Sequence, residues 1–133
     1  MSIVVPACGS GEKLRKYLNQ NFTLRLGSNN VIPDVTDDSS DYTEVAGGGY
    51  VAITLTFANW SIIDGNPAVA LYNAFQDFNF TGITGGPGTI YTYYVLDAGG
   101  ILGWSERFSS VPITPQNGTL IRIKPRYTER NQV

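Results

Sequence analysis

The chain has 133 residues and a formal net charge of −2, with 15 % charged residues, 12 % aromatic residues and 15 glycines. This length fits one domain that buries its core without a metal or a disulfide, and Cys8 is the only cysteine, which excludes an intrachain disulfide. Most of the nine basic residues are divided between the first helix-like stretch and the C-terminal tail. We therefore expect no nucleic-acid partner.

Residues 1–9 are predicted to form an extended N-terminal arm, because Pro6 disfavours helical geometry in the residue before it. The apolar run in this arm is too short for a signal peptide, and no later stretch approaches a membrane span. We expect synthesis in the cytoplasm and no membrane partner. A short helix should follow, capped by Ser10 or Gly11 and ending near Asn19, since Leu14 and Leu18 have helical spacing.

Most of the remaining chain alternates between apolar and polar residues over short runs separated by turn formers, which predicts β-strands. Phe22, Leu24 and Leu26 should face the core in the first strand. The other predicted strands are residues 50–57, 60–63, 68–72, 75–80 and 119–125, with a hairpin turn at 64–67 and a polar tail at 127–133.

Residues 89–108 predict the central hairpin, with a turn at residues 97–100. Closing that turn pairs Leu96 with Ile101, and Tyr93 with Trp104. One face, predicted to be core, carries Tyr91, Tyr93, Val95, Leu102, Trp104 and Phe108. The other carries Ile90, Tyr94, Leu96 and Ile101, an apolar surface that either the domain's own second layer or another chain should cover.

About eight short strands with one N-terminal helix predict an all-β fold, a single β-sandwich domain of jelly-roll or immunoglobulin-like kind. A closed barrel is the alternative. Residues 34–44 hold Asp34, Asp37, Asp38, Asp41 and Glu44. Calcium binding is one interpretation of this stretch, but the glycine spacing of the known calcium loop is absent, which favours a metal-free surface loop.

The sequence contains no histidine, the commonest general base, which argues against an enzyme. Asp97 and Glu106 are the carboxylate pair to consider for glycoside hydrolysis, and a structural role is the preferred interpretation. Trp60 and Trp104 are the candidates for stacking on sugars, although tryptophans on alternating strands usually belong to the core. We expect no catalytic, cofactor-binding or metal-binding residues.

Residues 94–108, Asn117-Gly118 and residues 121–125 together resemble a family of small virion proteins of tailed bacteriophages. Residues 22–30, Gly49-Tyr50 and residues 66–68 extend this resemblance over nearly the whole chain. The resemblance implies a capsid cement or decoration protein on the outer surface of the virion, made in the host cytoplasm, with the major capsid protein as partner and a homotrimer as its assembly. It implies no catalytic residues.

The contact residues that we expect for such assembly are Ile3, Val4 and Val5 in the arm, together with Ile90, Tyr94 and Ile101 on the hairpin. Two other functions remain open. One is a carbohydrate-binding module of a tail fibre or baseplate, and the other is a head-completion or tail component.

Overall fold

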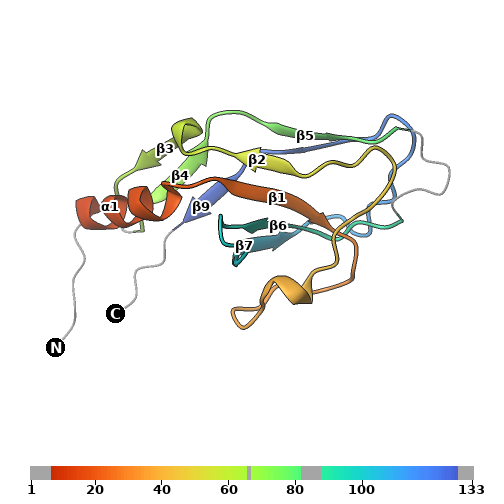
Figure 1. Cartoon of the computed structure of the whole chain (residues 1–133), viewed down its shortest axis with the longest axis horizontal. Helices are drawn as coiled ribbons and strands as arrows, with labels where there is room; N and C mark the ends of the chain where they lie inside the picture. Colours follow the sequence, from red (N-terminus) through yellow and green to blue (C-terminus); the bar gives the residue numbers. More distant parts are fainter. Residues whose placement is uncertain (1–6, 66, 82–87, 129–133) are drawn as a thin grey trace. The chain divides into compact units, whose positions relative to one another are not determined.

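The computed structural model describes residues 7–65, 67–81 and 88–128 of the chain (Figure 1). Residue contacts gather in two compact units. Unit 1 comprises Met1–Asn21, Thr56–Gln76 and Ile123–Val133, and unit 2 comprises Phe22–Leu55 and Asp77–Arg122. The single domain inferred from the sequence stays a prediction.

Unit 1 contains the helix α1 (Ala7–Leu18), the 3₁₀ turn η2 (Phe57–Asn59) and the strands β3 (Trp60–Ile63), β4 (Val69–Tyr72) and β9 (Arg126–Thr128). The strands form an antiparallel sheet in the order β3-β4-β9. The β3–β4 hairpin is the one that the sequence predicted. Leu14 and Leu18, on the predicted apolar face of α1, are 1 % and 0 % exposed, and the helix contacts β3 and β4.

The helix begins at Ala7, about one turn before the predicted cap, so residues 7–9 are helical and do not belong to an extended arm. Gly11 is not a cap. A Cβ at this position would collide with the carboxylate of Asp64, which also lies 3.4 Å from Arg15 Nη1. The glycine therefore permits a close approach to the helix and does not mark its start.

Unit 2 contains an antiparallel sheet in the order β2-β1-β6-β7, formed by β2 (Ile53–Leu55), β1 (Phe22–Gly27), β6 (Thr92–Leu96) and β7 (Leu102–Arg107). The 3₁₀ turn η1 (Ser39–Asp41) lies in the long connection from β1 to β2. A two-stranded sheet pairs β5 (Gln76–Asn79) with β8 (Leu120–Ile123), and all but the end residues Gln76 and Ile123 belong to unit 2.

The four-stranded sheet has two different faces. Residues that lie directly opposite each other on neighbouring strands share a face, as Leu24 and Val95 do on one and Arg25 and Tyr94 on the other. The apolar face carries Phe22, Leu24, Leu26, Tyr93, Val95 and Trp104, with Glu106 opposite Tyr93. The polar face carries Arg25, Gly27, Thr92, Tyr94, Ser105 and Arg107, with the apolar pair Leu96 and Leu102 at its hairpin end. The predicted inward residues of β1 lie on the apolar face and are fully buried.

The predicted register of the central hairpin is wrong. Tyr93 lies opposite Glu106, Val95 opposite Trp104 and Leu96 opposite Leu102, with an irregularity between Val95 and Leu96. Gly103 is the extra residue of this bulge. Because a bulge reverses the alternation, Leu102 moves away from the apolar face, where the sequence had placed it. Tyr93 and Trp104 are therefore not directly opposed, although both lie on the apolar face, where Trp104 packs against Phe22 with ring centroids 5.4 Å apart.

Two strand boundaries also need correction. The strand predicted at 50–57 shrinks to β2, with Val51 73 % exposed, because Tyr50 stacks on Phe78 and its hydroxyl accepts a hydrogen bond from the Leu26 N–H at 3.3 Å. With Tyr50 held by these contacts, the chain joins the pairing with β1 only from Ile53 onward. The predicted polar tail begins with β9, because the chain after Pro125 pairs with β4.

The overall class is as predicted: an all-β, sandwich-like fold of antiparallel sheets with one short N-terminal helix. Strands 75–80 and 119–125 are also confirmed in outline, with Phe78, Phe80, Ile121 and Ile123 buried.

Candidate functional site

The structure separates the contact residues that the sequence had grouped on the hairpin. Ile90 and Tyr94 are 0 % and 2 % exposed, so they are core residues and cannot form a free contact surface. Ile101, in the hairpin turn, is 67 % exposed and remains available. Ile3, Val4 and Val5 lie outside the described residues.

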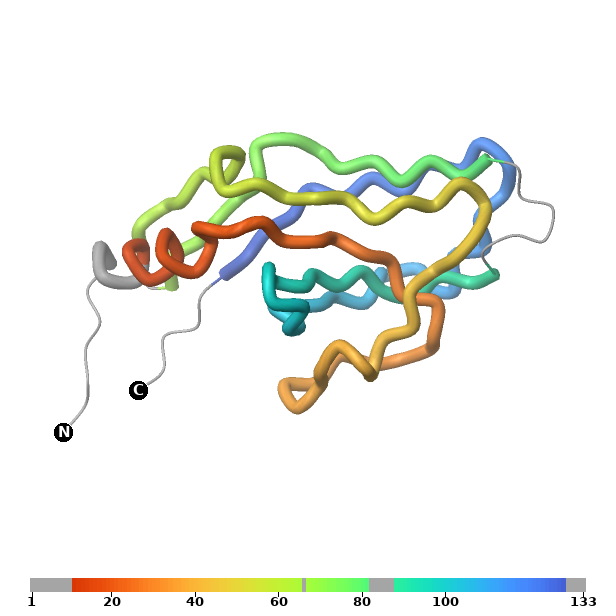
Figure 2. The backbone as a smooth tube through the Cα atoms, in the orientation of Figure 1, coloured from red at the N-terminus to blue at the C-terminus, as the bar shows by residue number. Residues whose placement is uncertain are grey.

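The cover on Tyr94 comes from the chain itself, through the segment 28–45 that connects β1 with η1 and continues toward β2. Figure 2 shows this segment leaving the end of β1 and returning to the next strand. Tyr42 stacks on Tyr94 with ring centroids 5.0 Å apart, and its hydroxyl contacts Asp37 Oδ2 at 2.9 Å and Ser105 Oγ at 2.6 Å. The apolar surface predicted on this face is thus an internal contact.

Further polar contacts fix the same segment to the polar face. Arg107 Nη1 donates to Asn30 Oδ1 at 2.8 Å and to the Val31 carbonyl at 2.9 Å. Glu44 Oε2 accepts from the Tyr50 hydroxyl at 2.8 Å and lies 3.5 Å from Arg25 Nε. Burial, and then the hydrogen bond to Glu44, raises the pKa of Tyr50, so this hydroxyl keeps its proton and acts as a structural donor.

Aspartates of the acidic stretch accept hydrogen bonds from groups within it. Asp34 Oδ1 accepts from the Thr36 N–H and hydroxyl, both at 3.0 Å, and Asp38 Oδ1 accepts from the Ser40 N–H at 2.8 Å. The bonds to Thr36 and Ser40 lower the pKa of Asp34 and Asp38 respectively. In the part of the chain that the structure describes, no three metal-ligating side chains gather into a site.

Asp97 and Glu106 are both used in internal hydrogen bonds and lie at different positions along the hairpin. Asp97 Oδ1 accepts from the N–H groups of Gly99 and Ile101, which closes the hairpin turn, and Glu106 accepts from the Tyr93 hydroxyl at 2.5 Å. Asp97 pairs through its N–H with Ile101, and five strand residues from there to Glu106 span about 16 Å. Glycosidases need their two carboxyl groups within about 10 Å.

The tryptophans are poorly placed for a sugar-stacking platform. Trp60 is 8 % exposed and meets the edge of Tyr72 with ring centroids 5.0 Å apart. Trp104 is half-buried and packs against Phe22 on the apolar face. An open ring face, which carbohydrate stacking requires, is therefore lacking at Trp60 and restricted at Trp104.

Two exposed surfaces that combine large apolar side chains with charge were missed from the sequence. The first, the acidic surface of unit 2, consists of Ile32, Asp34, Val35 and Asp38, with Ile32 78 % and Val35 90 % exposed. The second, the basic surface of unit 1, consists of Phe75, Lys124 and Arg126, with Phe75 57 % exposed. For the acidic surface, the signal in the sequence was the mixing of apolar and charged residues in a run that lacks strand alternation.

The two units also differ in net charge. Among the described residues, unit 1 has five basic and two acidic side chains, a net charge of +3, whereas unit 2 has three basic and eight acidic, a net charge of −5. The total charge of the chain conceals this difference because the units largely cancel.

No protein-family model, no curated protein and no solved structure matches this chain. Among the residues that the structure describes, there is no helix of sufficient length and apolar character to cross a bilayer.

Proposed function

We propose that this chain is a non-enzymatic structural protein of a virion, and that it acts as a cement or decoration protein on the capsid shell. The observation that carries the proposal is the pair of exposed surfaces, where Val35, Ile32 and Phe75 present large apolar side chains to solvent. Exposed apolar side chains combined with charge are typical of protein–protein contact sites.

The polar side chains considered for chemistry support a structural role. Asp97 closes a turn, Glu106 binds the Tyr93 hydroxyl, and Tyr42 bridges Asp37 and Ser105. Each group is already used for internal hydrogen bonds, whereas catalysis requires groups directed toward a substrate. The resemblance to small virion proteins of tailed bacteriophages is the reason to propose a virion as the location, the major capsid protein as the partner and a homotrimer as the assembly.

The proposal is tested by measuring the protein in purified virus particles. Cultures that carry the gene are induced, particles are purified on density gradients, and the chain is quantified by mass spectrometry against the major capsid protein. We expect hundreds of copies per particle, as a shell component requires. A handful of copies would favour a neck or fibre component, and absence from the particles would overturn the virion assignment.

A further inference from the structure

The acidic and basic surfaces have complementary properties, and both belong to the same chain. The acidic surface presents the exposed side chains of Ile32 and Val35 in the same short segment as the exposed carboxylates of Asp34 and Asp38. The basic surface presents Phe75 beside Lys124, and the exposed cation Arg126 follows two residues after Lys124 in the chain. Each surface thus offers apolar contact area together with one sign of charge.

The acidic surface is held in place by contacts that lie outside it. Asp37 Oδ2 accepts from the Asp34 N–H at 3.0 Å and from the Tyr42 hydroxyl, while Arg107 binds the Val31 carbonyl at 2.9 Å. These bonds anchor both ends of the stretch to the polar face of the sheet. Because the surface is already ordered, binding costs less conformational entropy than it would for an unstructured loop.

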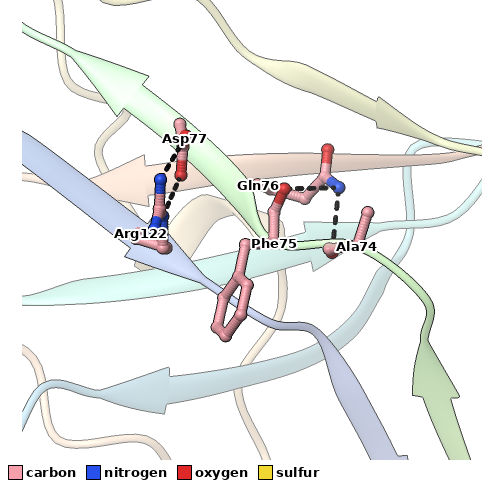
Figure 3. Close-up of polar contacts among 5 residues, drawn as sticks. All are labelled: Ala74, Phe75, Gln76, Asp77 and Arg122. Atoms are coloured by element: carbon pink, nitrogen blue, oxygen red, sulfur yellow. Dashed lines mark hydrogen bonds and ion pairs between the residues drawn. The ribbon is translucent and has the colours of Figure 1, made fainter.

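The basic surface follows from alternation along the chain between β8 and β9. Arg122, Lys124 and Arg126 are exposed, and the residues between them are buried. Arg122 is neutralised by Asp77 through hydrogen bonds of 2.8 and 3.1 Å, as Figure 3 shows. Lys124 Nζ lies 5.5 Å from the centre of the exposed Phe75 ring, a cation–π arrangement that keeps its charge beside an apolar surface.

We propose that the acidic surface of one copy of this chain binds the basic surface of a second copy. Opposite charges attract across this pairing, whereas two acidic or two basic surfaces would repel each other, which disfavours a two-fold symmetric dimer through either surface. The contact therefore joins unlike surfaces, and its repetition gives a closed ring, of which a reciprocal dimer is the smallest, or an open chain. The inference goes beyond the virion assignment and rests only on charge, exposure and contacts.

The test is sedimentation velocity of the full chain over a range of concentrations, at low ionic strength and at about 1 M salt, where the Debye length is ~3 Å. We expect a mass that rises above the 14.5 kDa monomer with concentration and returns toward the monomer in high salt. A monomer at every concentration would overturn the proposal.

Substitutions on each surface locate the contact. Lys124→Glu with Arg126→Glu reverses the charge of the basic surface, whereas Ile32→Lys with Val35→Lys removes the apolar side chains of the acidic surface and cancels its charge; all four side chains are exposed. Each double variant should weaken self-association by at least about 10-fold, the first because acidic surfaces then face each other and the second because apolar contact and attraction are both lost. Mixing the two variants should restore association, since the intact acidic surface of one variant can bind the intact basic surface of the other.

The matched control is Lys13→Glu with Lys16→Glu, which makes the same change in charge at exposed positions of α1, outside both surfaces. This control should keep the self-association of the original chain. If it dissociates as strongly as the basic-surface variant, net charge and not the proposed contact drives assembly. Thermal melting confirms folding of every variant, and Lys124→Gln with Arg126→Gln replaces the reversal if that variant unfolds.

Discussion

The two faces of the four-stranded sheet are buried by different means. The apolar face itself carries aliphatic side chains such as Leu24 and Val95, and these are fully buried. The polar face is covered by the segment 28–45, whose contacts combine ring stacking on Tyr94 with hydrogen bonds to Ser105 and Arg107. Burial of apolar area is non-directional, whereas each hydrogen bond depends on the position of two particular atoms.

This difference predicts that the apolar face tolerates changes of shape that conserve volume, while the polar face is sensitive to single atoms. It also predicts larger losses from the apolar face, because truncation of a buried aliphatic side chain removes more free energy than one hydrogen bond contributes. The following substitutions test the larger losses from the apolar face and the sensitivity of the polar face to single atoms.

Leu24→Ala should produce the largest effect, since Leu24 is fully buried in the middle of β1. We expect a loss of about 2–5 kcal/mol in the free energy of unfolding, measured by urea denaturation. Thr23→Ala is the control on the same strand, because Thr23 is only half-buried, and it should cost less than about 1 kcal/mol. Similar losses for the two variants would contradict the distinction between the faces.

Gly27→Ala tests steric tolerance on the polar face. A Cβ on Gly27 would collide with the hydroxyl of Thr92, which lies opposite on β6 and is fully buried. We expect a loss of about 1–3 kcal/mol from this overpacking.

Two further variants isolate the cause. In a Thr92→Ala background the same glycine substitution should cost clearly less, because the colliding atom is gone. Gly99→Ala is the matched control, since its Cβ would meet only Asp97 Oδ1 at an ordinary 3.4 Å. An equal cost for Gly27→Ala with and without Thr92 would place the strain elsewhere.

The difference between burial along a strand and contacts between distant segments also explains what could be predicted from the sequence. Alternation located Phe22, Leu24 and Leu26 correctly because side-chain direction along a strand is a local property. The hairpin register was wrong by one residue at the turn, where Leu96 pairs with Leu102 and not with Ile101, and by a second residue beyond the bulge at Gly103. Both shifts depend on how β7 fits β6, which no local pattern reveals. The contact of Tyr42 with Ser105, which helps to hold Tyr42 over Tyr94, was missed because these two residues are 63 positions apart in the sequence.

The candidate surfaces were missed for a related reason. Ile90 and Ile101 look alike in the sequence, but they are 0 % and 67 % exposed, since tertiary packing covers only one of them. The basic surface joins residues from two distant segments, Phe75 before β5 and Lys124 after β8. Only the paired strands bring these residues together.

Tyr42→Phe removes the hydroxyl that joins Asp37 and Ser105 while keeping the ring on Tyr94. We expect a loss of about 0.5–1.5 kcal/mol, measured by urea denaturation. Ser105→Ala completes a double-mutant cycle, in which the two losses should not add because both variants break the same hydrogen bond. Fully additive losses would show that the two hydroxyls act independently.

Acid denaturation should reveal the smallest effect, at the carboxylates that shape the acidic surface. The pKa of Asp34 and of Asp38 is lowered in the folded chain by hydrogen bonds to Thr36 and Ser40 respectively. A lowered folded pKa gives stability that is present above the unfolded pKa of about 3.9 and is lost as the pH falls through the folded value. The stabilisation should therefore disappear only in strong acid.

Asp38→Asn separates charge from geometry, because asparagine caps a helical turn about as well as aspartate. Thermal melting from about pH 6 to about pH 2 should show a small advantage for the original chain at the upper end that vanishes at the lower end. Both carboxylates are exposed, so about 1 M salt should reduce their charge-dependent contribution at high pH. If the melting temperature of the original chain stays equally far above that of the variant in acid, Asp38 stabilises the turn through its shape and not its charge. The fold of segment 28–45 at this turn would then depend on geometry alone.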